Sequence, residues 1–281
     1  MEWKNEIAIH MPPIIKPLIR SIYYIDLPLR NRLIPSKRLA ALYGSDEGED
    51  FRRTGDALIS TLIKHAGLSN TSRVLDVGCG TGLLAVPLTS ILSKGSYEGF
   101  DTISPGIKWC KSHITKKYPN FHFSLFDIYH ESYNPTGKIQ ASDFRFPYDD
   151  SSFDIVILRS IFTHFKPEEL RHYVSEINRV TKPGGRSFIT FHLVNPETAD
   201  LMENGKSYFH FEYKVEHGCY TTNLNRKSEY AYEESYIRMI YNDYDLKVQE
   251  PILYGGWRNG TNIKEPNFQD IVVAYKSEPH A

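Results

Sequence analysis

Short apolar runs alternate with longer amphipathic stretches along most of the chain after residue 55. The apolar runs are typical of buried strands, and spacings of three and four between apolar residues are typical of helices packed on a sheet. Strands are predicted at 74–77, 97–101, 121–128, 153–159, 186–193, 246–254 and 269–276. Helices are predicted at 55–66, after Gly82, from Ser104, at 167–180 and around 232–240. This alternation predicts an α/β fold with a doubly wound, mostly parallel sheet.

A glycine-rich segment follows the first predicted strand. Gly78, Gly80 and Gly82 end that strand in a tight turn where a ligand can approach the backbone. Their G-x-G-x-G spacing differs from the dinucleotide fingerprint. Asp76 would sit badly beside a pyrophosphate but suits S-adenosylmethionine, which carries a sulfonium, an ammonium and no phosphate. Asp101 ends the second strand, where an acid is expected to hold ribose hydroxyls.

Three motifs carry a resemblance to a known family. Residues 76–82 (DVGCGTG) resemble the first motif of the class I S-adenosylmethionine-dependent methyltransferases. Residues 146–156 (FPYDDSSFDIV) and 176–185 (EINRVTKPGG) are similar to the segments that precede this family's fourth and fifth strands. The resemblance covers residues 73–192 and is weaker beyond them. It implies a Rossmann-like, seven-stranded, mostly parallel sheet with an antiparallel last strand, methyltransferase activity, and S-adenosylmethionine as cofactor.

The resemblance and the strand-end positions together imply a set of cofactor contacts. Asp127 is similar to the family position that accepts a hydrogen bond from the adenine amino group, with Ile128 near the ring. An insertion at 129–142 separates Asp127 from the next motif, so Asp143 is the alternative, and the insertion itself is expected to contribute to the pocket. The predicted cofactor contacts are Asp76, Gly78, Cys79, Gly80, Gly82, Asp101, Thr102, Asp127, Ile128 and Arg159.

Candidate catalytic groups follow the fourth and fifth strands. His164 and His192 could each act as a general base, which methyl transfer needs only for a poorly acidic hydroxyl or a protonated amine. A structural histidine is the equally weighted alternative for both. His210, Trp257 and Arg258 are predicted substrate contacts, with a surface loop as the alternative for the last two.

Composition and local sequence narrow the range of partners. The chain has 281 residues, with 33 Lys and Arg against 34 Asp and Glu, and a formal net charge of −1. No global charge therefore attracts nucleic acid, and the fourth strand is not followed by the motif of base-amino methyltransferases. No metal site is predicted. The start has no leader pattern, no apolar run is long enough to span a membrane, and the three cysteines form no disulfide framework, so a cytoplasmic location is expected.

The chain is predicted to divide into two regions. Residues 1–54 form an N-terminal arm or lid, and residues 55–281 form the methyltransferase domain. Prolines break any long helix in 7–30, so this arm is expected to pack on the domain or on a second subunit in a homodimer; a membrane-surface segment is the less favoured alternative. Residues 196–228, irregular and rich in aromatics, are predicted to be a substrate-side insertion, with a pair of added strands as one interpretation.

The predicted function is S-adenosylmethionine-dependent O-methylation of a small polar acceptor, such as a sugar, a glycan or a secondary metabolite. Two alternatives remain open. One is a cofactor-binding, methyltransferase-like module that acts as a non-catalytic partner. The other is a protein or RNA methyltransferase. The intact set of Asp76, Asp101 and Asp127 favours a working enzyme.

Overall fold

The computed structural model describes residues 33–42, 49–216, 218–222, 229–260 and 268–278. The predicted arm at 7–30 lies outside the described residues, so its packing on the domain or on a second subunit stays a prediction. Within the described ranges, no helix combines the length and the apolar character that a membrane crossing requires.

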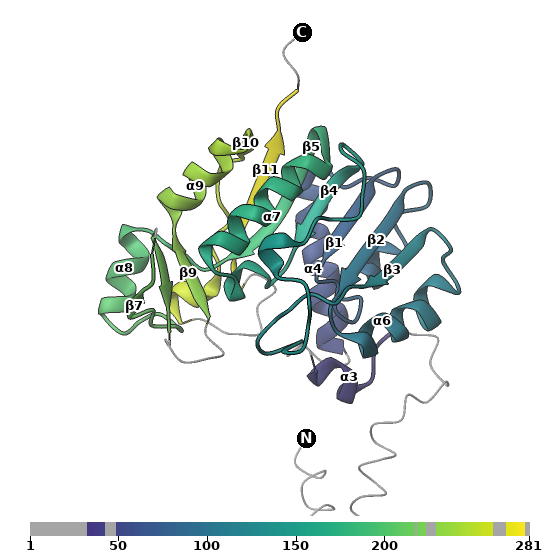
Figure 1. Ribbon diagram of the computed structural model, residues 1–281, viewed down its shortest axis with the longest axis horizontal. Coiled ribbons are helices and arrows are strands. Elements are labelled where there is room, and N and C mark those ends of the chain that lie inside the picture. Colours follow the sequence, from purple (N-terminus) through teal and green to yellow (C-terminus); the bar gives the residue numbers. More distant parts are fainter. Residues whose placement is uncertain (1–32, 43–48, 217, 223–228, 261–267, 279–281) are drawn as a thin grey trace, which may run out of the picture.

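A seven-stranded sheet forms the centre of the molecule (Figure 1). Its strand order is β10-β11-β5-β4-β1-β2-β3, and β11 alone runs opposite to the other strands of this sheet. This confirms the predicted fold class. The order reverses between β1 and β4, which is where open α/β sheets bind their ligands. The strands are β1 Arg73–Val77, β2 Ser96–Asp101, β3 Phe121–Leu125, β4 Phe153–Leu158, β5 Thr181–Phe191, β10 Leu246–Val248 and β11 Asp270–Lys276.

Helices cover both faces of the sheet (Figure 1). The apolar stripes of α4, α5 and α6 form one buried cluster with one face, and those of α7 and α9 form a second cluster with the other. The predicted start at residue 55 is corrected, because α4 begins at residue 49 and already buries Phe51 in the core. The helices are α3 Lys37–Ala41, α4 Glu49–Ala66, α5 Ala85–Leu88, α6 Ser104–Cys110, α7 Pro167–Val180, α8 Pro196–Glu203 and α9 Glu234–Asp243.

A smaller four-stranded sheet, ordered β6-β9-β8-β7, lies beyond β5. It contains the added strands that were one interpretation of residues 196–228. The same region also contains α8, which was not predicted. The Asn195 side chain caps α8 by accepting from the Thr198 N–H, and Pro196 occupies the first turn. The small-sheet strands are β6 Leu193–Val194, β7 Tyr213–Lys214, β8 Cys219–Thr221 and β9 Tyr230–Glu233.

Some strands are shorter than predicted. β3 ends at Leu125 because the Asp127 carbonyl accepts from the backbone N–H groups of Lys138 and Ile139, which turns the chain into the insertion. The insertion therefore starts directly at the ligand end of the sheet. Four short non-α helical segments complete the described elements: η1 Lys111–Thr115, η2 Ala141–Asp143, η3 Phe162–His164 and η4 Gly256–Asn259.

Candidate active site

The glycine-rich loop lies between β1 and α5, where its conformation requires glycine. Gly78 has a φ of 75°, and a Cβ added there would lie 2.3 Å from the Ile161 side chain. The loop is fixed because the N–H groups of Gly78 and Cys79 both donate to the Phe100 carbonyl at the end of β2. Gly82 also has a positive φ, of 80°, and a Cβ added there would lie 2.9 Å from Ile114 Cδ1.

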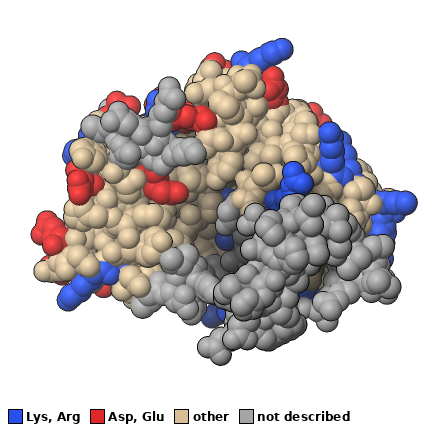
Figure 2. Space-filling view, turned by 90° about the horizontal axis from the view of Figure 1, so that it is seen from below, with Lys and Arg blue, Asp and Glu red and all other residues tan. Residues whose placement is uncertain are grey.

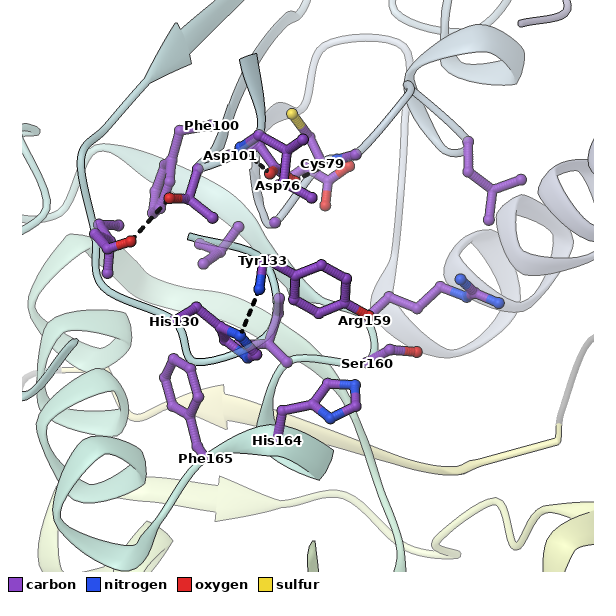
Figure 3. A pocket seen from close by; sticks show the side chains of 18 of the residues that line it. Asp76, Cys79, Phe100, Asp101, His130, Tyr133, Arg159, Ser160, His164 and Phe165 are labelled. Carbon is purple, nitrogen blue, oxygen red and sulfur yellow. Dashed lines mark hydrogen bonds between the residues drawn. The ribbon is translucent and has the colours of Figure 1, made fainter. Parts of the chain in front are cut away.

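A first cavity, of about 240 Å³, opens at the carboxyl ends of β1, β2 and β4 (Figure 3). Tyr129, His130 and Tyr133 of the insertion line it, which confirms that the insertion contributes to the pocket. Gly82 and Asp127 are the predicted cofactor contacts that do not line it. The other predicted contacts all do: Asp76, Gly78, Cys79, Gly80, Asp101, Thr102, Ile128 and Arg159.

Two buried carboxylates face this cavity. Asp101 fixes the glycine loop, because its two oxygens accept from the N–H groups of Gly80 and Ile103, both at 2.8 Å. Burial raises the pKa of Asp101, and these backbone hydrogen bonds oppose the shift. Asp76 accepts a 2.6 Å hydrogen bond from the Tyr97 hydroxyl. Burial raises the pKa of Asp76 to about 7, although the Tyr97 hydrogen bond lowers it.

The two residues proposed to bind adenine both lie outside this cavity. Asp127 and Asp143 are exposed, and neither lines the first cavity. Asp127 instead accepts from the Asn134 amide at 3.1 Å, and the same amide donates to Thr102 Oγ1 at 3.0 Å. Asp127 thus helps to fasten the insertion to the sheet, and the adenine contact stays a prediction for either residue.

A second cavity, of about 670 Å³, adjoins the first. Both are lined by Tyr129, His130, Tyr133, His164 and Phe165. In Figure 3, Tyr133 lies between the carboxylates of Asp76 and Asp101 on one side and the His164 ring on the other. The remaining lining is mostly polar, and is formed by Ala41, Leu42, Glu131, Ser132, Gln140, Ser142, Lys166, Glu168, Glu169, Glu229 and Tyr230.

His164 lies where the two cavities meet, at the end of η3. Its Nδ1 atom is 3.7 Å from Glu229 Oε1. The neighbouring His130 was not predicted, and its Nδ1 accepts from the backbone N–H groups of Ser132 and Tyr133. Burial, and then the nearby His164, lower the pKa of His130 to about 4, so His130 is neutral near pH 7. A general-base role for His164 stays a prediction.

His192, the other predicted base, lines neither cavity and is 1% exposed. Its ring packs against Phe209, Phe211 and Trp257 with centroid distances of 5.0–5.5 Å. Burial lowers its pKa to about 3. The prediction that His192 contacts an acceptor is therefore corrected. His192 is buried, and its Nδ1 atom lies 4.0 Å from Glu229 Oε2.

The predicted substrate contacts Trp257 and Arg258 are also corrected. Trp257 is completely buried and donates from Nε1 to Asp270 at 2.8 Å. Arg258 is buried as well, and it donates to Thr198 Oγ1 at 2.6 Å within the first turn of α8. Because both side chains bind the protein's own fold, their role is structural. His210 is exposed near Glu212 and lines neither cavity.

Comparison with known proteins identifies the domain. Residues 75–189 match the family model described as a methyltransferase domain. The chain contains a methyltransferase domain. The predicted resemblance to methyltransferases is thereby confirmed for this segment.

A curated relative is similar to part of this chain. The methyltransferase domain is 34% identical over 113 residues to the phthiotriol/phenolphthiotriol dimycocerosates methyltransferase of Mycobacterium tuberculosis, covering 40% of this chain. The chain spans about a third of the length of that relative, 35%.

Two solved structures share the fold of the methyltransferase domain. The PH0226 protein from Pyrococcus horikoshii OT3 has a TM-score of 0.57 at 18% identity, over 82% of this chain and 92% of its own. Magnesium protoporphyrin IX methyltransferase from Synechocystis, solved with bound SAH, has a TM-score of 0.51 at 17% identity, over 85% of this chain and 93% of its own. At these identities the likeness concerns the fold.

Proposed function

We propose that this protein is an S-adenosylmethionine-dependent methyltransferase that methylates a hydroxyl group of a small polar acceptor. The observation that carries the proposal is the junction of the two cavities. The first cavity contains most of the predicted cofactor contacts, and it adjoins a larger, mostly polar cavity with His164 at the boundary. This is the arrangement that a bound methyl donor and a separate acceptor require.

The residues of the first cavity fit S-adenosylmethionine. The Asp76 and Asp101 carboxylates suit its positive charge and its ribose hydroxyls, and the glycine loop leaves room for close approach to the backbone. Thr81 lines the cavity, and its buried hydroxyl has no hydrogen-bond partner within the described part of the chain. A buried hydroxyl of this kind is expected to bond to a ligand.

S-adenosylmethionine supplies an electrophilic methyl group when it is bound. The protein's own part is to orient the acceptor, exclude water and take up the acceptor's proton. We assign the uptake of the proton to His164, which borders both cavities, because the Nδ1 atom of the neighbouring His130 already accepts from two backbone N–H groups. Hydroxyl, amide and carboxylate groups of the second cavity can hydrogen-bond a molecule rich in hydroxyls.

The surface charge supports a small acceptor over a nucleic acid. Figure 2 shows acidic side chains mostly at the left of the viewed face and basic ones mostly at the right. On the described residues of this face, the basic side chains do not form a continuous band that could follow a phosphate backbone.

The test is transfer of a labelled methyl group to a panel of sugars, glycans, alcohols of secondary metabolites, proteins and RNA. We expect labelling of one small hydroxyl compound, and about a hundredfold slower transfer by His164→Gln with unchanged cofactor binding. The control is His122→Gln, since His122 pairs with Glu98 at 2.9 Å outside both cavities and should keep full activity.

Two results would contradict the proposal. Labelling of protein or RNA alone would exclude the small acceptor. Cofactor binding without transfer to any compound would favour the non-catalytic module.

A further inference from the structure

Glu229 lies between two histidines that are distant from it in the sequence. It immediately precedes β9 and lines the second cavity, with its side chain 29% exposed. Its Oε1 atom lies 3.7 Å from His164 Nδ1, and its Oε2 atom lies 4.0 Å from His192 Nδ1. The sheet topology therefore brings η3, the end of β5 and the start of β9 together around one carboxyl group.

The surroundings of Glu229 disfavour its negative charge when no positive charge is near. Burial raises the pKa of this carboxyl to about 7. A protonated imidazole beside the Glu229 carboxylate would compensate for the hydration that this carboxylate loses on burial, as the two charges of a buried ion pair do for each other. His164 is the neighbour that can provide this charge, because His192 is buried with a pKa lowered to about 3.

We propose that Glu229 positions His164 as the group that takes the acceptor's proton. This inference rests on the proposed function. A carboxylate facing Nδ1 favours the tautomer with hydrogen on Nδ1, which places the lone pair of the ring on Nε2. The acceptor oxygen gains the methyl group and loses its proton to Nε2 of His164, and the electron pair of the broken carbon–sulfur bond stays on sulfur. Glu229 then stabilises the imidazolium that results.

Other titratable groups around this pair must be included in any pH profile. His130 is neutral near pH 7, and burial and the charge of Glu229 raise the pKa of Tyr133. Lys166 also lines the second cavity and carries a positive charge. The titratable groups that face the pair or line the same cavity are Tyr129, His130, Glu131, Tyr133, Lys166, Glu168, Glu169, His192 and Tyr230.

The test is an NMR titration of the His164 imidazole in the full chain without cofactor, assigned with His164→Gln. In Glu229→Gln we expect the pKa of His164 to fall by about one unit. With the acceptor found by the labelling screen, we expect kcat at pH 7 to fall about tenfold while KM changes less than about twofold. Glu229→Asp keeps the charge and should retain most of both properties.

Glu98→Gln is the matched control, because Glu98 also faces a histidine Nδ1, at 2.9 Å from His122, but lines neither cavity. It should leave both the His164 titration and kcat unchanged. An identical His164 titration in wild type and Glu229→Gln would overturn the inference, even if methyl transfer is observed. A shifted titration in a protein that methylates no acceptor would support the pairing and count against the proposed function.

Discussion

At the scale of single residues, Asp76 shows how the glycine loop depends on a partner from another strand. Its carboxyl group is 2% exposed and its hydrogen-bond donor, the Tyr97 hydroxyl, is completely buried in β2. Parallel pairing of β1 and β2 places Asp76 opposite Gly99, so the Tyr97 ring lies beside the start of the loop. A group with so little contact with water should make stability depend on pH.

We predict that Asp76→Asn changes that dependence. The folded-state pKa of Asp76, about 7, lies above the ordinary value of 3.8. Its contribution to the free energy of unfolding is therefore fully present below pH 4 and is lost as pH rises to 7. The unfolding free energy of the variant minus that of wild type should therefore rise by at most about 1.4 kcal/mol for each pH unit between pH 4 and pH 7. Urea unfolding at pH 4.5, 5.5 and 6.5 measures the difference.

The exposed Asp150 is the control for this experiment. Arg179 donates to Asp150 and holds its pKa below the ordinary value, so its contribution is already complete above pH 4. Asp150→Asn should therefore show no trend between pH 4.5 and 6.5. Unfolding curves of Asp76→Asn that remain parallel to wild type across the range would contradict the prediction.

Residues that share a motif could be predicted from the sequence, whereas residues joined only by tertiary structure could not. Asp76, the glycines and Asp101 lie at strand ends whose pattern is local. Glu229 lies 65 positions after His164 in the sequence. The two side chains meet only because η3 and the start of β9 lie side by side in the fold. Trp257 and Arg258 were misassigned, because an aromatic ring beside a guanidinium suits a buried network as well as a ligand site.

At the scale of elements, Asp270 joins three segments at the start of β11. Its Oδ1 atom accepts from the Gly255 N–H, and its Oδ2 atom accepts from the Leu193 N–H and from Trp257 Nε1, at 2.7–2.8 Å. It therefore links β11, the turn from β5 into the small sheet, and η4. Because this group is completely buried, its donors have no access to water as a replacement partner.

We expect Asp270→Asn to lower the unfolding free energy by about 2 kcal/mol, because an NH2 group, which cannot accept a hydrogen bond, replaces one carboxyl oxygen. Urea unfolding followed by tryptophan fluorescence measures the loss. Asp243→Asn is the control. Among the described residues, Asp243 makes only an exposed ion pair with Arg171 at 3.5 Å, so this substitution should cost less than about 0.5 kcal/mol. Equal losses in the two variants would show that the Asp270 network is not a major support of the fold.

The elements themselves were predicted unevenly. The central strands and α7 follow clear apolar patterns, so their positions agree with the structure within a few residues. The helix α8 was missed, although Asn195 followed by Pro196 and Glu197 is the usual start of a helix. The many aromatic residues that follow obscured this short signal.

At the scale of the whole molecule, the sheet order places both cavities at one edge. The strand reversal between β1 and β4 opens the first cavity, and the insertion, η3 and the start of β9 build the second beside it. The sequence predicted the first cavity because its residues follow family motifs. The second was not predictable in the same way, since its lining comes from four separated segments that only the complete fold assembles.

The predicted substrate role of residues 196–228 stays a prediction. None of their described members lines either of these two cavities. In the described part of the chain, the second cavity is instead formed by α3, the insertion, the segment from η3 into α7, and Glu229 with Tyr230.

The most direct test of the cofactor site in the first cavity is calorimetric titration with S-adenosylmethionine and S-adenosylhomocysteine. We predict that the wild type binds both, that Asp101→Ala loses binding while its far-UV circular dichroism stays native, and that Asp56→Ala, an exposed carboxylate of α4, binds as the wild type does. Absence of binding by the wild type, or equal binding by Asp101→Ala, would contradict the assignment of the first cavity as the cofactor site.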